Sequence, residues 1–224
     1  MERAAPVKSP SGEPDRALEP AIELRGLRRE FGDRVAIDGL DLRVDVGAAV
    51  AVLGPNGSGK STLLRILAGL LRPSGGEVSV LGCDLPKETH LLRGRVGYLG
   101  HEPLLYRDLS PRENLELVGA LHGLDAEAWD PRIDELLDAV GMTARARDRV
   151  AELSAGMRQR IDICRAVLHE PELLLLDEPD AHLDPQARRE VAPLIAAGGR
   201  RTRLLVSHER GSATADADFV LELR

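Results

Sequence analysis

Aromatic residues are scarce in this sequence: the chain of 224 residues has two phenylalanines, two tyrosines and one tryptophan. A core of this size must be packed mainly with aliphatic side chains, since the hydrophobic fraction is 43%. Cysteine is scarce as well, and neither Cys83 nor Cys164 belongs to a CxxC pair. This excludes a disulfide framework and a CxxC-type zinc site. We expect both to be small core residues in a reducing compartment.

Long apolar runs and excess positive charge are also missing. No stretch of about 18 apolar residues occurs, so we predict no transmembrane helix, and the N-terminal residues lack the apolar core of a signal peptide. A formal net charge of −7 argues against a general nucleic-acid binder, which presents a basic surface. Nucleotides remain compatible with this charge, because their phosphates are held by backbone amides and one or two cations.

Residues 1–20 contain four of the 14 prolines among small and charged residues, which predicts a disordered leader. The alternative, a processed targeting peptide, fits less well because acidic residues are mixed in. Beyond this segment, apolar periodicity predicts strands at 22–27, 40–44, 48–53, 77–81, 95–99, 173–176, 203–206 and 219–223. Helices are predicted at 63–71, from Pro111, over 133–140, and near 156–169 and 186–197. Strands alternating with helices indicate a largely parallel sheet covered on both faces.

The most specific motif is a glycine-rich run between the predicted strand 48–53 and the helix that follows it. It fills every position of G-x-x-x-x-G-K-[ST] with Gly54, Pro55, Asn56, Gly57, Ser58, Gly59, Lys60, Ser61 and Thr62. Glycines let the backbone wrap closely around a di- or triphosphate, and the helix N-terminus attracts the anion. We expect Lys60 to reach the β- and γ-phosphates and Ser61 to ligate Mg²⁺, so ATP and Mg²⁺ are the predicted ligands. The alternative is a glycine-rich turn with a solvated lysine.

Two acids, Asp177 and Glu178, end the predicted strand 173–176. Ligands of open α/β sheets bind at the carboxyl ends of the strands. We expect Asp177 to orient the metal, directly or through water, and Glu178 to act as the general base that polarises the attacking water. A strand that simply ends in solvated acids is the alternative, so this motif gains its meaning from the phosphate loop.

The run Leu153-Ser154-Ala155-Gly156-Met157-Arg158-Gln159-Arg160 precedes these acids. With it, the sequence resembles the ABC ATPase family, whose signature reads LSGGQ-x-Q-R. The resemblance implies that the stretch Ser154, Ala155, Gly156 and Met157 opens a helix and contacts the γ-phosphate held by a second, head-to-tail protomer. Ala155 replaces a signature glycine and Met157 the usual glutamine, and the lost polar contact would weaken the closed dimer. The alternative is an ordinary N-cap serine followed by a flexible glycine.

The resemblance assigns four further positions. Phe31 matches the aromatic residue that stacks on adenine, and a core phenylalanine is the equally open alternative. His208 matches the switch histidine that contacts the γ-phosphate. Asp184 matches the D-loop aspartate that couples the two sites across the dimer. His101 stands where the family places a glutamine that senses Mg²⁺ and the transporter subunit, and whether His101 or the adjacent Glu102 takes that role is open.

The family also implies a fold and partners. The expected fold is α/β: a P-loop NTPase core with a mostly parallel sheet, an antiparallel β element near the N-terminus and an inserted helical subdomain over about 87–155, within a domain at 21–224. The expected activity is ATP hydrolysis coupled to transport, by a subunit peripheral to the inner face of the cell membrane. The expected partners are an ABC transporter membrane subunit and a second ATP-binding subunit, identical or not, with no nucleic acid.

The segment Tyr98–Pro103 and the variant signature look like the heme-exporter branch used in cytochrome c maturation. A multidrug or polyketide-exporter ATPase is the nearest alternative. Two other functional classes are alternatives. A non-transport ABC ATPase acting on DNA or ribosomes usually carries long coiled coils or two cassettes, for which this length leaves no room. A P-loop phosphotransferase or binding-only module explains the phosphate loop and leaves the signature unexplained.

Overall fold

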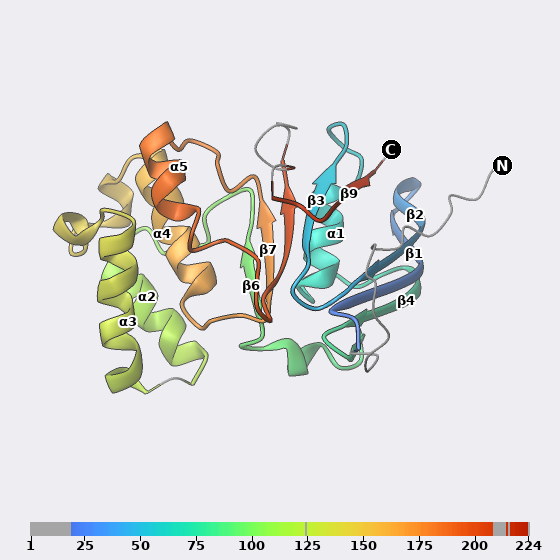
Figure 1. The fold of residues 1–224 in the computed structure, drawn as a ribbon, viewed down its shortest axis with the longest axis horizontal. Helices are drawn as coiled ribbons and strands as arrows, with labels where there is room; N and C mark the ends of the chain where they lie inside the picture. Colours follow the sequence, from blue (N-terminus) through green and yellow to red (C-terminus); the bar gives the residue numbers. More distant parts are fainter. Residues whose placement is uncertain (1–18, 124, 208–213, 215, 224) are drawn as a thin grey trace. The chain divides into compact units, whose positions relative to one another are not determined.

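The computed structural model describes residues 19–123, 125–207, 214 and 216–223 (Figure 1). These fall into two compact units. The first takes its described residues from Met1–Arg93 and Ala197–Arg224, and the second is Gly94–Ala196. The chain thus leaves the first unit once and returns to it. The predicted helical subdomain at about 87–155 overlaps the second unit without sharing its bounds.

An antiparallel sheet forms the N-terminal part of the first unit. It consists of β1 (Ile22–Phe31), β2 (Arg34–Val44), β4 (Gly75–Val80) and β5 (Cys83–Leu85), in the order β2-β1-β4-β5. Ile22, Leu24 and Leu27 are buried along β1, with a register shift between Leu24 and Leu27, so the strand buries its apolar side chains. Both N-terminal strands are longer than their predicted cores, and β5, which has three residues, was too short to be predicted from periodicity.

Three parallel strands form the other layer of the first unit. Strand β3 (Ala49–Leu53) pairs with β8 (Thr202–Val206) on one side and β9 (Phe219–Glu222) on the other. All residues of β3 and β8 are buried, as expected of parallel strands covered on both faces. Helix α1 (Lys60–Leu67) follows β3 and buries an aliphatic stripe of four residues: Leu63, Leu64, Ile66 and Leu67. The glycine-rich run therefore lies between the carboxyl end of β3 and the start of α1.

The second unit combines a parallel strand pair with four helices. Strand β6 (Val96–Leu99) pairs with β7 (Leu173–Asp177). The helices are α2 (Pro111–Leu121), α3 (Ala126–Ala139), α4 (Ala155–Val167) and α5 (Pro185–Val191). Pro111 occupies the first turn of α2, as predicted, and Ser110 and Glu113 form a reciprocal capping box there. Gly141 follows α3 with φ +65°, which confirms the predicted glycine stop.

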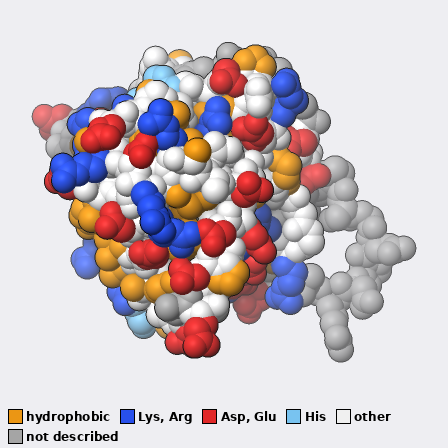
Figure 2. Space-filling model, turned by 90° about the vertical axis from the view of Figure 1, so that its left-hand side faces the viewer, with side chains coloured by type: hydrophobic (Ala, Val, Ile, Leu, Met, Phe, Trp, Pro, Cys, Tyr) orange, Lys and Arg blue, Asp and Glu red, His pale blue; other side chains and the backbone are white. Residues whose placement is uncertain are grey.

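The helical face of the second unit carries charges of both signs (Figure 2). Acidic and basic side chains are interspersed there, and Arg112 of α2 pairs with Asp130 and Asp134 of α3. Exposed ion pairs contribute little free energy, so packing must hold these helices together. The buried residues are aliphatic, as the composition requires: Leu115, Ile133, Leu136 and Leu137. Within the described ranges, no helix combines the length and the apolar character needed to traverse a bilayer.

Two predicted helices end earlier than expected. The helix predicted over 63–71 stops at Leu67 because Gly69 adopts φ +72°, and Leu70 beyond it is exposed. The helix predicted near 186–197 stops at Val191, because Pro193 has no amide hydrogen to continue the helical hydrogen bonds, although Ala192 still has helical backbone angles. Both cysteines are buried free thiols, which confirms the core assignment made from their scarcity.

Candidate functional site

The glycine-rich loop of the first unit has the geometry of an anion cradle. Pro55, Asn56 and Gly57 are exposed at its tip, and α1 begins directly after it at Lys60. The amides of the first turn of a helix have no acceptor within the helix, so those of Lys60, Ser61 and Thr62 are available to a ligand. A positive potential at this end of α1 adds to the attraction for phosphate. The loop therefore offers backbone donors and a favourable field at one place.

Lys60 brings a full positive charge to this loop. The residue is only 6% exposed, and its Nζ donates to the carbonyl oxygens of Gly54 at 2.7 Å and Pro55 at 2.9 Å. A buried ammonium group is costly unless it is paired, and two neutral carbonyls satisfy it only in part. An anionic phosphate at the loop would complete that pairing. The loop and Lys60 therefore fit the phosphates of a nucleoside triphosphate.

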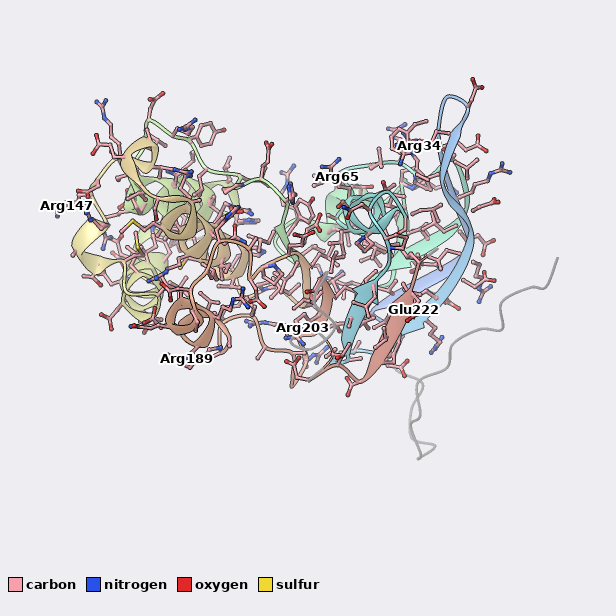
Figure 3. All side chains as sticks on the ribbon, turned by 90° about the horizontal axis from the view of Figure 1, so that it is seen from above. Arg34, Arg65, Arg147, Arg189, Arg203 and Glu222 are labelled. Atoms are coloured by element: carbon pink, nitrogen blue, oxygen red, sulfur yellow. The ribbon has the colours of Figure 1, made fainter. Side chains whose placement is uncertain are left out.

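Gly59 shows why the loop requires glycine. It adopts φ +94°, and a Cβ at this position would lie 2.4 Å from the carbonyl oxygen of Ala36 on β2. Both the backbone conformation and the close contact exclude larger residues. The neighbouring Arg34 of β2, labelled in Figure 3, donates from Nη2 to the carbonyl oxygen of Gly57 at 3.4 Å. The β1–β2 hairpin thus supports the loop and places a second cation at its tip.

Phe31 ends β1 on the same hairpin. The residue is 47% exposed, so the alternative of a core phenylalanine does not hold. The guanidinium carbon of Arg29 lies 4.3 Å from the ring centroid and covers one face of the ring. An exposed ring supported on one face is suited to stacking a planar base on the other. Stacking on adenine stays a prediction.

The two acids lie in the second unit, at the end of β7. Asp177 is 3% exposed, and among the described residues its buried Oδ2 has no hydrogen-bond partner. A buried carboxylate oxygen without a donor is costly, and a divalent cation would satisfy it, so Asp177 fits Mg²⁺. Ser61, the other predicted metal ligand, stands in the first turn of α1 in the first unit. Glu178 adopts φ +53°, in the left-handed region that is strained for a residue other than glycine. Such strained residues cluster at functional sites.

The second unit brings the signature stretch together with the segment after Glu178. Ser154 caps α4 by accepting a hydrogen bond from the Met157 amide at 3.2 Å. Ala155 is exposed, while Gly156 and Met157 are partly buried. The buried Gln159 donates to the carbonyl oxygen of Pro179 at 3.1 Å. The first turns of α4 are therefore hydrogen-bonded to the segment that directly follows Asp177 and Glu178.

Asp184, the predicted D-loop aspartate, has a local structural role. Its carboxylate caps α5 by accepting from the amides of Gln186 at 2.9 Å and Ala187 at 2.8 Å. The bond from Ala187 is the main cause that lowers the pKa of Asp184, with Arg160 of α4 also contributing. The carboxylate remains exposed, so capping leaves its outer surface open to a partner.

His101 and Glu102 are both exposed, directly after β6 and Gly100. No hydrogen bond of either residue shows which of the two takes the predicted sensor role. His208 lies outside the described residues.

Sequence reasoning missed two residues, Arg34 and Asp162 of α4. An arginine three positions after Phe31, and an acid set between two isoleucines on a buried helix, were the available signals.

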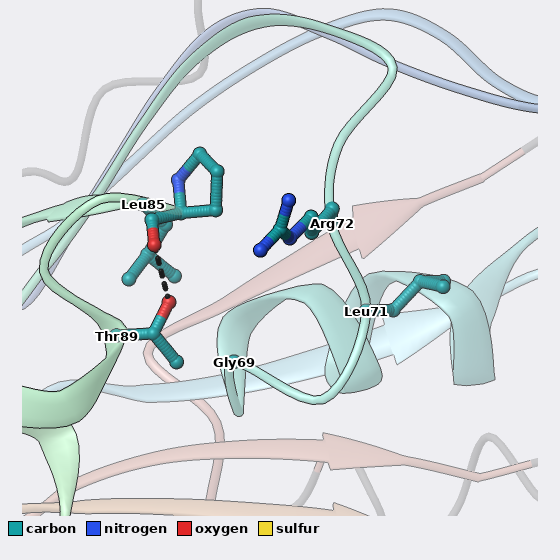
Figure 4. Close-up of a pocket in the computed structure, with 6 residues that line it drawn as sticks. Gly69, Leu71, Arg72, Leu85 and Thr89 are labelled. Atoms are coloured by element: carbon teal, nitrogen blue, oxygen red, sulfur yellow. Dashed lines mark hydrogen bonds between the residues drawn. The ribbon is translucent and has the colours of Figure 1, made fainter.

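A separate pocket of about 160 Å³ opens in the first unit beyond the end of α1 (Figure 4). It is lined by Gly69, Leu71, Arg72, Leu85, Pro86 and Thr89. The Thr89 hydroxyl donates to the Pro86 carbonyl at 3.0 Å. Arg72 is the charged residue among those that line the pocket. The pocket shares no residue with the phosphate loop and supplies no chemistry to it.

Comparison with known proteins gives three consistent findings. The model of the ABC transporter family matches residues 37–181. The chain is 43% identical over 202 residues to daunorubicin resistance ATP-binding protein DrrA3 of Streptomyces coeruleorubidus, covering 89% of this chain and 64% of that protein. It is 39% identical over 203 residues to Nod factor export ATP-binding protein I of Cupriavidus pinatubonensis, covering 89% and 62%. The chain thus spans somewhat less than two thirds of the length of these relatives.

Solved structures show the same fold. The ATP-binding subunit of an ABC transporter superposes with a TM-score of 0.81 at 29% identity, covering 91% of this chain and 88% of the other. A dimeric ATP-binding cassette in a post-hydrolysis state, bound to ADP and Pi, superposes with a TM-score of 0.81 at 25% identity, covering 91% and 94%. The predicted α/β fold with a P-loop NTPase core, a parallel sheet and an antiparallel β element is confirmed.

Proposed function

The chain belongs to the ABC transporter family, and we propose that it binds ATP on the Gly54–Thr62 loop and hydrolyses it to power an exporter. The observation that carries this proposal is the environment of Lys60. A buried ammonium group faces the carbonyls of a glycine-rich loop at the start of a helix, where only an anion completes its pairing.

In the proposed mechanism, Lys60 and the first-turn amides of α1 hold the β- and γ-phosphates. Ser61 and Asp177 would hold the metal, and bound Mg²⁺ would neutralise charge on the phosphates. Glu178 holds the attacking water and takes its proton. His208 would contact the γ-phosphate, His101 or Glu102 would act at the metal site, and Phe31 would stack on adenine. Nearly all the catalysis is positioning and electrostatic stabilisation, as is general for phosphoryl transfer.

We further propose that two ATP-binding subunits work as a pair. Ser154, Ala155, Gly156 and Met157 of one subunit would cover the γ-phosphate on the other, since a helix N-terminus favours an anion. The similar cassette that is dimeric with ADP and Pi supports this arrangement. Asp184 is exposed beside the signature helix, a position suited to the partner's surface. The motion of the pair would drive a membrane subunit at the inner face of the membrane.

The cargo class follows from the relatives. Their names refer to daunorubicin resistance and to Nod factor export, which support the multidrug-type alternative better than the heme-exporter interpretation. We therefore propose export of an organic natural product rather than delivery of heme for cytochrome c maturation. Cargo selection would reside in the membrane subunit.

The test of the ATPase proposal is Glu178→Gln, which keeps the size of the side chain and removes the base. We expect ATP affinity to stay within about threefold and kcat to fall by about 10²–10⁴-fold, the usual contribution of a general base. The variant should accumulate as an ATP-bound dimer in light-scattering measurements. Glu170→Gln, the same change at an exposed position before β7, is the matched control. Unchanged turnover in Glu178→Gln would remove this residue from its role.

A further inference from the structure

Asp162 is a fully buried acid in the middle of the signature helix α4. Its Oδ1 accepts from Arg165 Nε at 2.5 Å and from the Leu104 amide at 3.2 Å. Its Oδ2 is buried and has no hydrogen-bond partner within the described part of the chain. Burial raises the pKa of Asp162, although Arg165 opposes that effect. A buried ion pair with an unsatisfied oxygen contributes little to the free energy of folding, which points to a role other than stability.

Arg165 makes the second attachment. Its Nη2 donates to the carbonyl oxygen of Tyr98 at 2.6 Å, and its side chain is only 13% exposed. The ion pair therefore holds the chain at Tyr98, on β6, and again at Leu104. Between these two points lie the five residues 99–103, which include the exposed His101 and Glu102. A segment this short, fixed at both ends, has little freedom to move independently of α4.

Two further contacts join α4 and the residues after it to β6. A Cβ on Gly97 would lie 2.3 Å from the carbonyl oxygen of Ala166, so strand and helix are in close backbone contact. His169, just past the end of α4, lies with Nε2 3.2 Å from the carbonyl oxygen of Val96. Asp162, Arg165, Ala166 and His169 follow helical spacing on one face and contact progressively earlier residues of the β6 segment. Polar contacts and close backbone packing therefore alternate along the two elements.

We propose that the Asp162–Arg165 pair is a positioning device that fixes the His101–Glu102 segment to the signature helix. The proposal rests on the proposed ATPase function, in which this segment acts at the metal site. Asp162 and Arg165 touch neither nucleotide nor metal. They act by making the signature helix and the His101–Glu102 segment shift together, so that a movement of Ser154–Met157 at the start of α4 reaches the metal site. They do not contribute to nucleotide affinity, which is determined by the Gly54–Thr62 loop.

The test compares Asp162→Ala and Arg165→Ala with Asp148→Ala in the full chain. Asp148 forms an exposed i, i+3 pair with Arg145 in the same unit, which makes it a matched control. We expect both test variants to lower kcat by about tenfold or more and to raise the Mg²⁺ concentration that gives half-maximal turnover, because misplacement of a supporting group is costly. ATP affinity should stay within about threefold. The double variant should lose no more than the worse single variant, as a shared function requires.

A second measurement does not depend on turnover. Hydrogen exchange of the 99–106 segment should accelerate in Asp162→Ala and remain unchanged in Asp148→Ala. If Asp162→Ala does not fold, Asp162→Asn keeps an acceptor for the Leu104 amide and loses the charge facing Arg165. That variant should show intermediate exchange and intermediate Mg²⁺ dependence. A lower melting temperature with unchanged exchange, kcat and Mg²⁺ dependence would overturn the positioning role. A wild-type chain without ATPase activity would instead refute the proposed function, and the exchange result would still decide this one.

Discussion

Gly156 approaches the backbone of His182 so closely that no side chain fits between them. A Cβ on Gly156 would lie 2.6 Å from the carbonyl oxygen of His182, which itself adopts φ +62°. Gly156 lies in the first turn of α4, and His182 lies between the strand-end acids and Asp184. The signature glycine is thus required within a single subunit, before any contact with a second one is considered.

Gly156→Ala should therefore disturb the D-loop. Overpacking a close backbone contact costs about 1–3 kcal/mol, and the His182 segment is the part that must move. We expect ATP turnover to fall by about tenfold with ATP affinity unchanged, because the phosphate loop is not involved. Steady-state kinetics and nucleotide titration give the two numbers. The control is Gly75→Ala on β4, where a Cβ would make only an ordinary contact, 3.7 Å from the Cβ of Arg28, and equal losses in both variants would refute the role of this contact.

Phe31→Ala tests the adenine-stacking prediction. The ring is exposed on one face and covered by Arg29 on the other, so its removal should barely change the melting temperature. Loss of stacking should raise the dissociation constant of ATP by about 3–10-fold, which corresponds to about 0.5–1.5 kcal/mol. Phe31→Tyr should retain affinity because it keeps the ring. Val35→Ala, another exposed apolar side chain on the same hairpin, is the control, and an unchanged ATP affinity in Phe31→Ala would dismiss the prediction.

Asp177→Asn tests the metal assignment. The substitution keeps the shape of the side chain and removes the charge that would offset Mg²⁺, while the buried Oδ2 is the atom left without a partner in the described structure. We expect the Mg²⁺ concentration for half-maximal turnover to rise by about tenfold or more, with metal-free ATP binding unaffected. Asp180→Asn, on the loop just beyond, serves as the comparison. Identical Mg²⁺ dependence in the two variants would leave Asp177 a structural acid.

Much of the fold was predictable because its signals are local. The apolar run before Gly54 and the one before Asp177 each gave a buried strand, and Pro111 marked the start of α2. Errors occurred where a single residue ended a periodic pattern. Leu70 and Leu71 continue the apolar stripe of α1, yet Gly69 has already ended the helix. Periodicity reports which face is apolar, and the stop is decided by one backbone conformation.

The site was predictable only as far as its motifs extend. Lys60 and Asp177 belong to short runs whose chemistry is readable in sequence order. Arg34 and Asp162 do not, because each gains its meaning from a partner distant in sequence: the Gly57 carbonyl for Arg34 and the Leu104 amide for Asp162. An exposed arginine and a single acid on a helix are common, and only tertiary contacts distinguish these two.

Cys164 offers a probe of local opening in the second unit. It is fully buried on α4, and burial raises the pKa of its thiol from the ordinary 9.0 to about 12. At pH 8 only about one thiol in ten thousand would be ionised, and the thiolate is the reactive form. In a Cys83→Ala background, a disulfide reagent such as DTNB should therefore react slowly with the native chain and rapidly after denaturation.

The same shift gives a stability prediction with a definite sign. Because the folded pKa lies above the unfolded one, the unfolded chain loses its thiol proton first as the pH rises. The contribution of Cys164 to stability is complete below about pH 9 and is lost progressively towards pH 12. Denaturant titrations across this range should show a steeper loss for the Cys83→Ala chain than for the same chain carrying Cys164→Ala. Equal slopes, or fast DTNB reaction of the native chain at pH 8, would mean that α4 opens readily around this residue.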